Sequence, residues 1–441
     1  MPDPWFDELA ELIAIPSVSA DPAHAADVRR AAGWVRDFIV ASGGEAALVE
    51  TERQPLVIGE VRASANAESA PTVLCYCHFD VQPPAPVERW TSDPFTLVER
   101  DGWLYGRGVT DDKGQLCMVL AAVRALAAEG RLPVNVRLAF DGEEEVGGTS
   151  IGDWVAADTG PADACLILDG GMTERDKPEF TLATRGLIAF DLTVRTGSSD
   201  LHSGLFGNAG LNAIHALIQC LQALLPRGGR LPEPLRAGVL APSAEELAAW
   251  AALKPGGELL AQASIAPYDE RAAEEFYLRT WAEPSMEVNG FHAGKPILNT
   301  TLISSAQANF TLRLAPGQDP GEVAAAVRAL VEQAAPAGAE LDLVQVQGAR
   351  PGVVDPNAQA VQLGLDAFER ALGVRPLLVR VGGTMPVLSQ LVDRGVPTIM
   401  TGFGLPESNV HAPDERLPVE YVEVGTRTIR ELFIALGDLD P

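Results

Sequence analysis

Four short apolar runs, each followed by charged or polar side chains, constrain the fold of this chain most strongly. The runs are VLCYC before His78, VNVRLAF before Asp141, CLIL before Asp169, and PTIMTGF before a loop that leads to His411. Continuous apolar runs bounded by turn signals are typical of strands buried on both faces, and residues 114–130 show the pattern of a crossover helix. Strands and helices in this alternation predict an α/β fold with a mostly parallel sheet.

The sequence pattern changes near residue 184 and returns after residue 348. Between these points lie strand-like runs (GLIAFDLTVRT and NTTLISSAQANFTLRLAP) and helix-like runs (LNAIHALIQCLQALL and EVAAAVRALVEQAA). We therefore predict an α/β domain built from residues 1–183 and 349–441, with a smaller α+β domain, residues 184–348, inserted into it. Residues 230–267 match no motif.

Composition excludes several classes of function. The chain of 441 residues has 33 Lys and Arg against 60 Asp and Glu, a net charge of −27, whereas nucleic-acid binding needs a basic surface. Residues 116–128, the longest mostly apolar stretch, include Arg124 and are fewer than the roughly 20 residues of a membrane span. The acidic N-terminus does not have the pattern of a secretory signal, and the five cysteines are too scattered for a disulfide framework. We expect a cytoplasmic protein that binds neither nucleic acid nor membranes.

Side chains that can bind metal gather where the predicted strands end. In an open α/β sheet, ligands bind beyond the carboxyl ends of the strands, so these side chains should meet at one edge. A mixed set of imidazoles and carboxylates suits Zn²⁺ or Mn²⁺, and a carboxylate between two such ions can bridge them. The candidates are His78, Asp80, Asp111, Asp112, Glu143, Glu144, Glu145, Asp169 and His411.

Two local patterns suggest roles within this set. Side chains two residues apart in an extended segment point the same way, so Asp80 can accept the imidazole N–H of His78 and orient the ring. Adjacent glutamates cannot readily share one ligand position, so one can bind metal while its neighbour accepts a proton from water. Each pattern alone is more typical of a turn, a helix cap or a solvated charge, but their recurrence at successive strand ends favours a metal site.

Cys75 and Cys77 lie beside His78 in a predicted buried strand. This position favours their being small core residues rather than thiolate ligands of a metal.

Six motifs in chain order resemble the di-zinc metallopeptidase superfamily that includes carnosine dipeptidases, glutamate carboxypeptidase, aminoacylase and the succinyl-diaminopimelate desuccinylases. The motifs are CYCHFDVQP, LYGRGVTDDKGQ, FDGEEEVGG, LILDGG, DLHSGLFGN and ESNVHAPDE. The resemblance covers essentially the whole chain, including the inserted domain. It is closest to the dipeptidase branch, because of the forms of the second and fifth motifs and because residue 169 is Asp rather than Glu.

The resemblance implies two divalent metal ions per subunit, with Zn²⁺ as the first choice and Mn²⁺ as the alternative. It implies that His78 and Asp169 bind one ion, that Glu145 and His411 bind the other, and that Asp111 bridges them.

Two further assignments follow from the family's motif spacings. The spacing G-x-x-D-x-K-G selects Asp111 over Asp112 as the bridging residue, and the pattern E-E-x-G makes Glu144 the general base, with Glu143 a bystander. Asp80 matches the carboxylate that orients the histidine.

The inserted domain resembles the family's lid and dimerisation domain. The resemblance implies that His202 reaches the active site of the partner subunit in a homodimer and stabilises the oxyanion there. It implies that Arg313 binds a substrate carboxylate through its bidentate fork, together with Gly383 and Thr384 of a glycine-rich turn. Asn208 is a further candidate for lid contacts.

The function that the resemblance implies is metal-dependent hydrolysis of dipeptides or similar small amides with a free carboxylate. Glu144 would deprotonate a water that bridges the two metal ions, and the resulting hydroxide would attack the carbonyl. The alternative with the same metals is an N-acyl-amino-acid deacylase or carboxypeptidase. A catalytically silent peptide-binding dimer is disfavoured by the intact Glu144-Glu145 pair, and a di-metal phosphoesterase by the acidic field and the carboxylate-binding groups.

Overall fold

The computed structural model describes residues 4–294, 296–297 and 299–440, which form two compact units. The first unit comprises Met1–Leu182, Val354–Val379 and Gln390–Pro441, and the second comprises Ala183–Val353 and Arg380–Ser389. The strand β16 (Leu377–Val381) and the helix α11 (Pro386–Asp393) each contain a boundary between the units.

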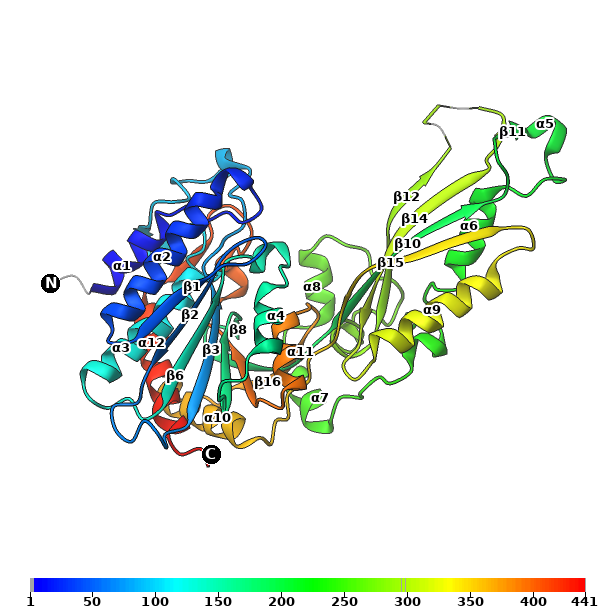
Figure 1. Ribbon diagram of the computed structural model, residues 1–441. Coiled ribbons are helices and arrows are strands. Elements are labelled where there is room, and N and C mark those ends of the chain that lie inside the picture. The colour runs from blue at the N-terminus through cyan, green and yellow to red at the C-terminus, as the bar shows by residue number, and fades with distance from the viewer. Residues whose placement is uncertain (1–3, 295, 298, 441) are drawn as a thin grey trace. The chain divides into compact units, whose positions relative to one another are not determined.

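A six-stranded sheet forms the centre of the first unit (Figure 1). Its strands, in spatial order, are β1 (Glu45–Val49), β2 (Leu56–Val61), β6 (Asn135–Asp141), β3 (Thr72–His78), β7 (Ala164–Leu168) and β17 (Thr398–Thr401). The pairs β6–β3, β3–β7 and β7–β17 are parallel, whereas β1 and β2 extend the sheet as antiparallel strands. Every residue of β3 and β7 is buried, as expected for strands covered on both faces.

Helices cover both faces of this sheet (Figure 1). They are α1 (Pro4–Ile13), α2 (Ala25–Ala41), α3 (Lys113–Ala128), α4 (Ser150–Ala157), α10 (Gln359–Leu372) and α12 (Val419–Leu436). The helices α2, α3 and α12 lie on one face, and α4 lies on the other. On α2, the buried residues Val28, Ala31, Val35 and Ile39 recur at helical spacing and form the apolar stripe that packs against the sheet.

The parallel strands bring the predicted site residues to one edge of the sheet. His78 is the last residue of β3 and lies opposite Asp141, the last residue of β6. Asp169 directly follows β7, whose neighbour β17 leads into the loop that carries His411. Since the carboxyl ends of parallel strands share an edge, residues far apart in the sequence meet there.

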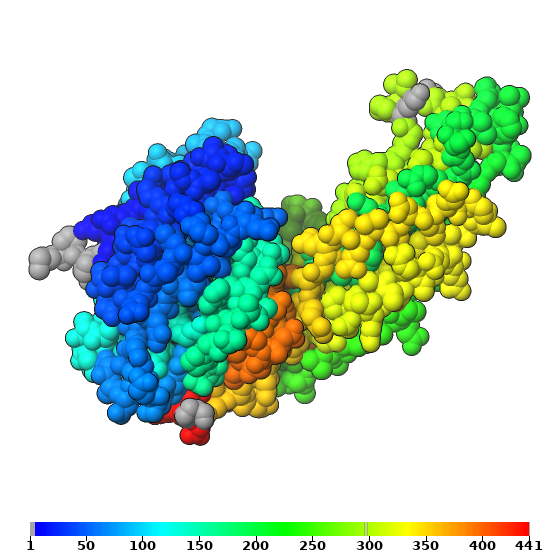
Figure 2. Space-filling model, viewed as in Figure 1, coloured from blue at the N-terminus to red at the C-terminus, as the bar shows by residue number. Residues whose placement is uncertain are grey.

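The second unit is built on a four-stranded antiparallel sheet. Its strands, in spatial order, are β12 (Ser285–Ala293), β14 (Ser305–Leu314), β10 (Gly186–Arg195) and β15 (Glu340–Ala349). Two helices, α6 (Ala213–Gln222) and α9 (Pro320–Ala334), pack against it, and α9 forms part of the outer surface of this unit, in yellow in Figure 2. The core between sheet and helices includes Phe190 stacked on Phe310, with ring centroids 5.3 Å apart. Alternating burial along β14 is typical of a strand with one face on such a core.

Smaller elements complete the second unit. They are β11 (Leu201–His202), β13 (Thr301–Leu302), α5 (Ser203–Phe206), α7 (Ala244–Trp250) and α8 (Gly256–Gln262). The helices α7 and α8 lie in the stretch 230–267, for which the sequence showed no motif.

The predicted α/β fold with a largely parallel sheet is confirmed, and the expected crossover helix is α3. The second compact unit extends slightly beyond the predicted residues 184–348, to Ala183–Val353, and it also includes the segment Arg380–Ser389. Arg380 is buried there and its Nε donates to Oε1 of Glu246 over 2.6 Å, an ion pair that ties the segment to α7. In the described part of the chain, no helix combines the length and apolar character needed to cross a bilayer.

Candidate metal centre

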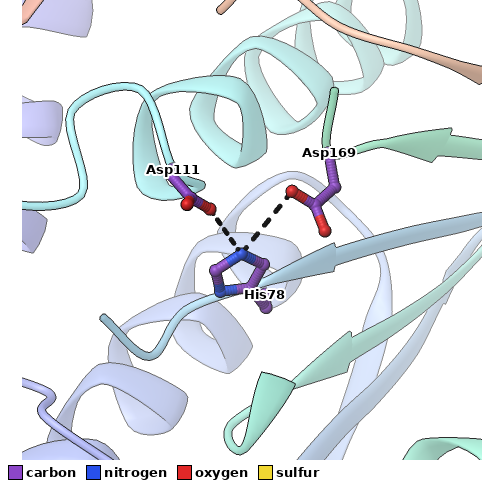
Figure 3. A group of neighbouring side chains, drawn as sticks. All are labelled: His78, Asp111 and Asp169. Carbon is purple, nitrogen blue, oxygen red and sulfur yellow. Dashed lines mark hydrogen bonds and ion pairs between the residues drawn. The ribbon is translucent and has the colours of Figure 1, made fainter. Parts of the chain in front are cut away.

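Asp111 lies at the centre of two groups of potential metal ligands in the first unit. In the first group, Nε2 of His78 lies 2.9 Å from Oδ1 of Asp111 and 3.7 Å from Oδ1 of Asp169 (Figure 3). In the second, Nε2 of His411 lies 2.9 Å from Oδ2 of Asp111 and 3.1 Å from Oε2 of Glu145. The donor atoms within each group lie within 4.8 Å of one another. The two oxygens of Asp111 thus face two different histidines, the arrangement expected of a bridging carboxylate.

The turn before α3 positions Asp111. Gly108 has φ +86°, and a Cβ at this position would lie 2.6 Å from Cγ1 of Val81, so the turn requires glycine. Lys113, fully buried in the first turn of α3, donates from Nζ to the carbonyl oxygens of Leu12 and Ile15 at 2.9 and 2.7 Å. These contacts fix the start of α3 against the N-terminal segment.

Asp80 links the two ligand groups. Its carbonyl oxygen and Oδ1 lie 3.1 and 3.3 Å from Nδ1 of His78, on the side of the ring opposite Asp111. Its carboxylate also accepts the backbone N–H groups of Glu144 and Glu145, each at 3.2 Å. Asp80 therefore orients the ring of His78 and the backbone of the glutamates together, which is the kind of support that metal-binding histidines usually receive.

The three consecutive glutamates differ in their contacts. Glu145 accepts from the backbone N–H and the Nε2 of Gln82, at 3.1 and 2.9 Å. Glu143 is fully buried and accepts the backbone N–H groups of Ser150 and Gln54. Glu144 alone of the three has a carboxylate without a hydrogen-bond partner among the described residues, so it is free to exchange a proton.

Asp112 has a supporting contact and belongs to neither ligand group. Its Oδ2 accepts the backbone N–H of His78 at 3.1 Å, and the side chain is fully buried. The structure therefore separates the two adjacent aspartates into one that faces both histidines and one that holds the end of β3.

Burial and neighbouring charges shift the pKa values of the site. Burial, reinforced by Asp169 and Glu145 against the opposing effect of His78, raises the pKa of Glu144 to about 8. Burial likewise raises the pKa of Asp169 to about 6. Hydrogen bonds to Asp111 and Glu145 raise the pKa of His411 to about 10. Burial tends to raise the pKa of Asp111, but hydrogen bonds from His411 and His78 prevail and lower it. The excess of carboxylates around two imidazoles favours the binding of cations. A mixed set of imidazole and carboxylate ligands suits Zn²⁺ or Mn²⁺.

Glu415 and Arg107 are site residues that the sequence did not reveal. Both are fully buried, and Oε2 of Glu415 accepts from Nη1 of Arg107 at 2.7 Å and from the N–H of Gly108 at 2.9 Å. Its Oε1 accepts the N–H groups of Thr110 and Asp111 at 2.9 and 3.1 Å. Glu415 thus fastens the Asp111 turn to the loop that carries His411. The only available signal was the Glu at the end of ESNVHAPDE.

A cavity of about 330 Å³ opens beside the first ligand group. It is lined by Thr110, Asp111, Gln115, Asp169, Gly170, Gly171, Met172, Gly404, Leu405, Pro406 and Val410. A larger cavity of about 490 Å³, lined in part by Arg175 and Tyr421, contains none of the predicted ligands. The smaller cavity reaches two of the predicted ligands, Asp111 and Asp169, and can therefore admit a reactant to that part of the metal centre.

The second unit holds the remaining predicted residues. Nη1 of Arg313 on β14 donates to Oγ1 of Thr384 at 2.6 Å, so the structure brings these two together beside Gly383. His202 is exposed on β11, and its Nδ1 accepts the N–H of Gly204 at 3.0 Å. Asn208 is exposed, with φ +64°.

Residues 74–435 match Peptidase family M20/M25/M40. A cysteinylglycine-S-conjugate dipeptidase of Corynebacterium striatum is 30% identical over 457 aligned residues, which cover 98% of this chain and 95% of the relative. The human Beta-Ala-His dipeptidase is 25% identical, with coverage of 99% and 91%.

Solved structures share the fold over nearly the whole chain. The dipeptidase Dug1p of Saccharomyces cerevisiae has a TM-score of 0.76 at 24% identity, with 99% of this chain and 96% of that chain covered. The metallo-carboxypeptidase Sso-CP2 of Sulfolobus solfataricus has a TM-score of 0.84 at 24% identity, with coverage of 99% and 100%. The resemblance seen in the motifs is thus confirmed, and the chain belongs to Peptidase family M20/M25/M40, as a metallopeptidase that acts on peptide bonds.

Proposed function

We propose that this protein is a dipeptidase in which Asp111 bridges two divalent metal ions and Glu144 acts as the general base. The observation that carries the proposal is the position of Asp111, whose two carboxylate oxygens lie 2.9 Å from His78 and from His411. Asp169 would complete one ligand set and Glu145 the other. Zn²⁺ is the metal that we propose first, with Mn²⁺ as the alternative, because both accept mixed imidazole and carboxylate ligands.

When bound, the two cations would polarise the scissile carbonyl, lower the pKa of a nearby water and favour the ionised form of Glu144. Glu144 takes the proton from the attacking water and passes it to the leaving amine, because its carboxylate alone among the three glutamates is free of hydrogen bonds in the described part of the chain. Asp80 holds the ring of His78 and the backbone of Glu144 through its contacts to both.

The second unit is proposed to supply substrate recognition as a lid and dimerisation domain. Arg313, with Thr384 and the backbone of Gly383, forms a group suited to a carboxylate, since a guanidinium and backbone N–H groups both favour anions. We further propose a homodimer in which His202 acts across the subunit interface on the developing oxyanion, with Asn208 contributing to lid contacts. The side chain of His202 is exposed, and among the described residues its ring makes one hydrogen bond, at Nδ1 from the N–H of Gly204, which leaves Nε2 available for this role.

The substrate class is proposed from the relatives. The cysteinylglycine-S-conjugate dipeptidase of Corynebacterium striatum and the human Beta-Ala-His dipeptidase align with nearly all of this chain. Dipeptides with a free C-terminal carboxylate are accordingly the proposed substrates. A cytoplasmic address is proposed on the basis of five free, buried cysteines, which suit a reducing compartment.

A substrate screen tests this proposal. Purified protein, loaded with Zn²⁺ or Mn²⁺, is offered dipeptides, N-acetyl amino acids and N-succinyl amino acids, and release of free amino acid is measured. We expect cleavage of dipeptides to be fastest. Cleavage of acylated amino acids alone would replace the dipeptidase proposal with the deacylase alternative, and release of single residues from the C-terminus of longer peptides would replace it with a carboxypeptidase.

A further inference from the structure

Two arginines share one face of the sheet in the second unit. Arg313 on β14 pairs with Leu187 of β10 on one side and with Ser285 of β12 on the other. Arg185 lies two residues before Leu187, and side chains two apart in an extended segment point the same way. Nη1 of Arg185 donates to Oγ of Ser285 at 3.1 Å, which confirms that both guanidinium groups lie on this face.

Arg185 is a buried cation without a carboxylate partner. Arg185 is only 9% exposed, and its Nε donates to the carbonyl oxygen of Gly382 at 3.0 Å. Within the described part of the chain, no carboxylate lies within 4.0 Å of either Arg185 or Arg313. Other buried arginines of this protein do have one: Arg107 pairs with Glu415 and Arg380 with Glu246.

An unpaired buried cation is unfavourable, and a second cation beside it increases the cost. Burial, followed by the charge of Arg313, lowers the pKa of Arg185 to about 10, and the charge of Glu287 opposes this only in part. Glu287 is an exposed residue of β12 that lies two positions after Ser285. The protein itself therefore neutralises the positive charge on this face only in part, and a bound anionic ligand would complete the neutralisation.

The two arginines hold opposite ends of the same glycine-rich turn. Arg185 contacts Gly382 through Nε and donates its backbone N–H to the carbonyl oxygen of Gly383 at 3.0 Å, while Arg313 donates to Thr384. A Cβ at Gly382 would lie 2.9 Å from the carbonyl oxygen of Thr280 and 3.3 Å from Nη2 of Arg185, so a larger residue would push the turn away. The turn that offers its backbone and hydroxyl to an anion is thus shaped by Arg185.

We propose that Arg185 is the second cation of a substrate-carboxylate receptor and the residue that positions its glycine-rich turn. The receptor consists of Arg185, Arg313, Gly383 and Thr384, and it makes the protein select peptides with a free C-terminal carboxylate over the corresponding C-terminal amides. The inference rests on the proposed function, which it deepens by assigning a specificity-determining residue that the sequence motifs did not include.

The test compares one dipeptide with its own C-terminal amide. The substrates are the dipeptide that the wild type cleaves best and the C-terminal amide of that dipeptide. For each substrate, kcat and KM are measured with the wild type, Arg185→Met and Arg185→Lys. For Arg185→Met, we expect kcat/KM for the free acid to fall by about tenfold to a hundredfold, mainly through KM, and that for the amide to change by less than about threefold. Arg185→Lys keeps the charge without the planar fork, so the ratio of acid to amide should fall to an intermediate value.

Arg195→Met is the matched control, because Arg195 is an exposed arginine at the other end of β10. It should leave the ratio of acid to amide unchanged. The proposal is overturned if Arg185→Met and Arg185→Lys lower the rates for acid and amide equally, or change neither. Should Arg185→Met not fold, the ratio in Arg185→Lys decides alone, and an unchanged ratio overturns the proposal. A wild type that cleaves no dipeptide would instead overturn the proposed function.

Discussion

The backbone N–H of Asp111 donates to Oε1 of Glu415 over 3.1 Å, although the two residues are 304 positions apart. The same carboxylate accepts the N–H groups of Gly108 and Thr110 and the guanidinium of Arg107. Arg107 in turn donates, at longer distances, to the carbonyl oxygens of Pro83 and Ala412. One buried ion pair therefore connects the three loops that carry Asp80, Asp111 and His411.

Replacing Glu415 should weaken metal binding before it affects the fold. The carboxylate of Glu415 accepts from three backbone N–H groups and from the guanidinium of Arg107. In Glu415→Gln, the side-chain NH₂ group faces some of these donors and cannot accept from them, so the Asp111 turn loses its fixed position. We expect metal affinity, measured by competition with a chromophoric chelator, to fall by about tenfold to a hundredfold. Glu407→Gln, at an exposed acid of the same loop region, is the control and should keep wild-type affinity. Unchanged affinity in Glu415→Gln would show that the turn needs no such support.

Two of the proposed ligands, His78 and Asp169, were predictable because they stand at the ends of buried strands. The runs that precede His78 and Asp169 are apolar and β-rich, and parallel strands must bring their carboxyl ends together. Glu415 carried no comparable signal, since an acid in a loop is normally solvated, and only the tertiary structure shows that this one is buried against Arg107. The fold class was likewise predictable from local patterns. The assignment of Arg380–Ser389 to the second unit was not, because it depends on long-range contacts such as the ion pair between Arg380 and Glu246 and the hydrogen bond between Arg313 and Thr384.

Replacing Glu144 should separate chemistry from metal binding. Glu144→Gln retains the shape of the side chain but removes the base, so we expect kcat to fall by about 10²- to 10⁴-fold while the metal content stays at the wild-type value. Metal content is measured by elemental analysis of the same samples used for kinetics. Glu99→Gln, at an exposed glutamate of the first unit, is the control. A Glu144→Gln variant with full metal and near-normal kcat would refute the assignment of the base.

Metal binding should release protons at neutral pH. Hydrogen bonds to Asp111 and Glu145 raise the pKa of His411 to about 10, and nearby acids raise that of His78 despite its burial. The ring of His411 is therefore expected to be protonated in the metal-free protein at pH 7, and the shift at His78 favours its protonated form too, whereas a ligand imidazole must be neutral.

We expect about one proton to be released per histidine, and apparent metal affinity to rise with pH from 7 until His411 titrates near 10. Calorimetry in buffers of different ionisation enthalpy measures the number of protons. His411→Ala should lower it by about one. Binding that releases no proton and is independent of pH would contradict the assignment of both histidines.

Complementation should reveal whether His202 acts across a subunit interface. His202→Ala and Glu144→Gln each inactivate their own type of dimer, but a mixed dimer contains one complete site. Equal mixing should restore about a quarter of wild-type activity, because half of the dimers are mixed and each has one active site of two. Subunit exchange is verified independently with differently tagged chains. Exchange without recovered activity would place His202 in its own subunit's site or outside the site altogether.

Metal titration of chelator-treated protein tests directly whether hydrolysis depends on two ions held around Asp111. The metal-free protein should not cleave its best dipeptide, and activity should reach its maximum at about two equivalents of Zn²⁺ or Mn²⁺ per chain. Asp111→Asn should fail to recover under the same titration, because both ligand sets share this residue. Full hydrolysis by the metal-free protein, or no hydrolysis at any metal loading, would contradict a metal-dependent dipeptidase centred on Asp111.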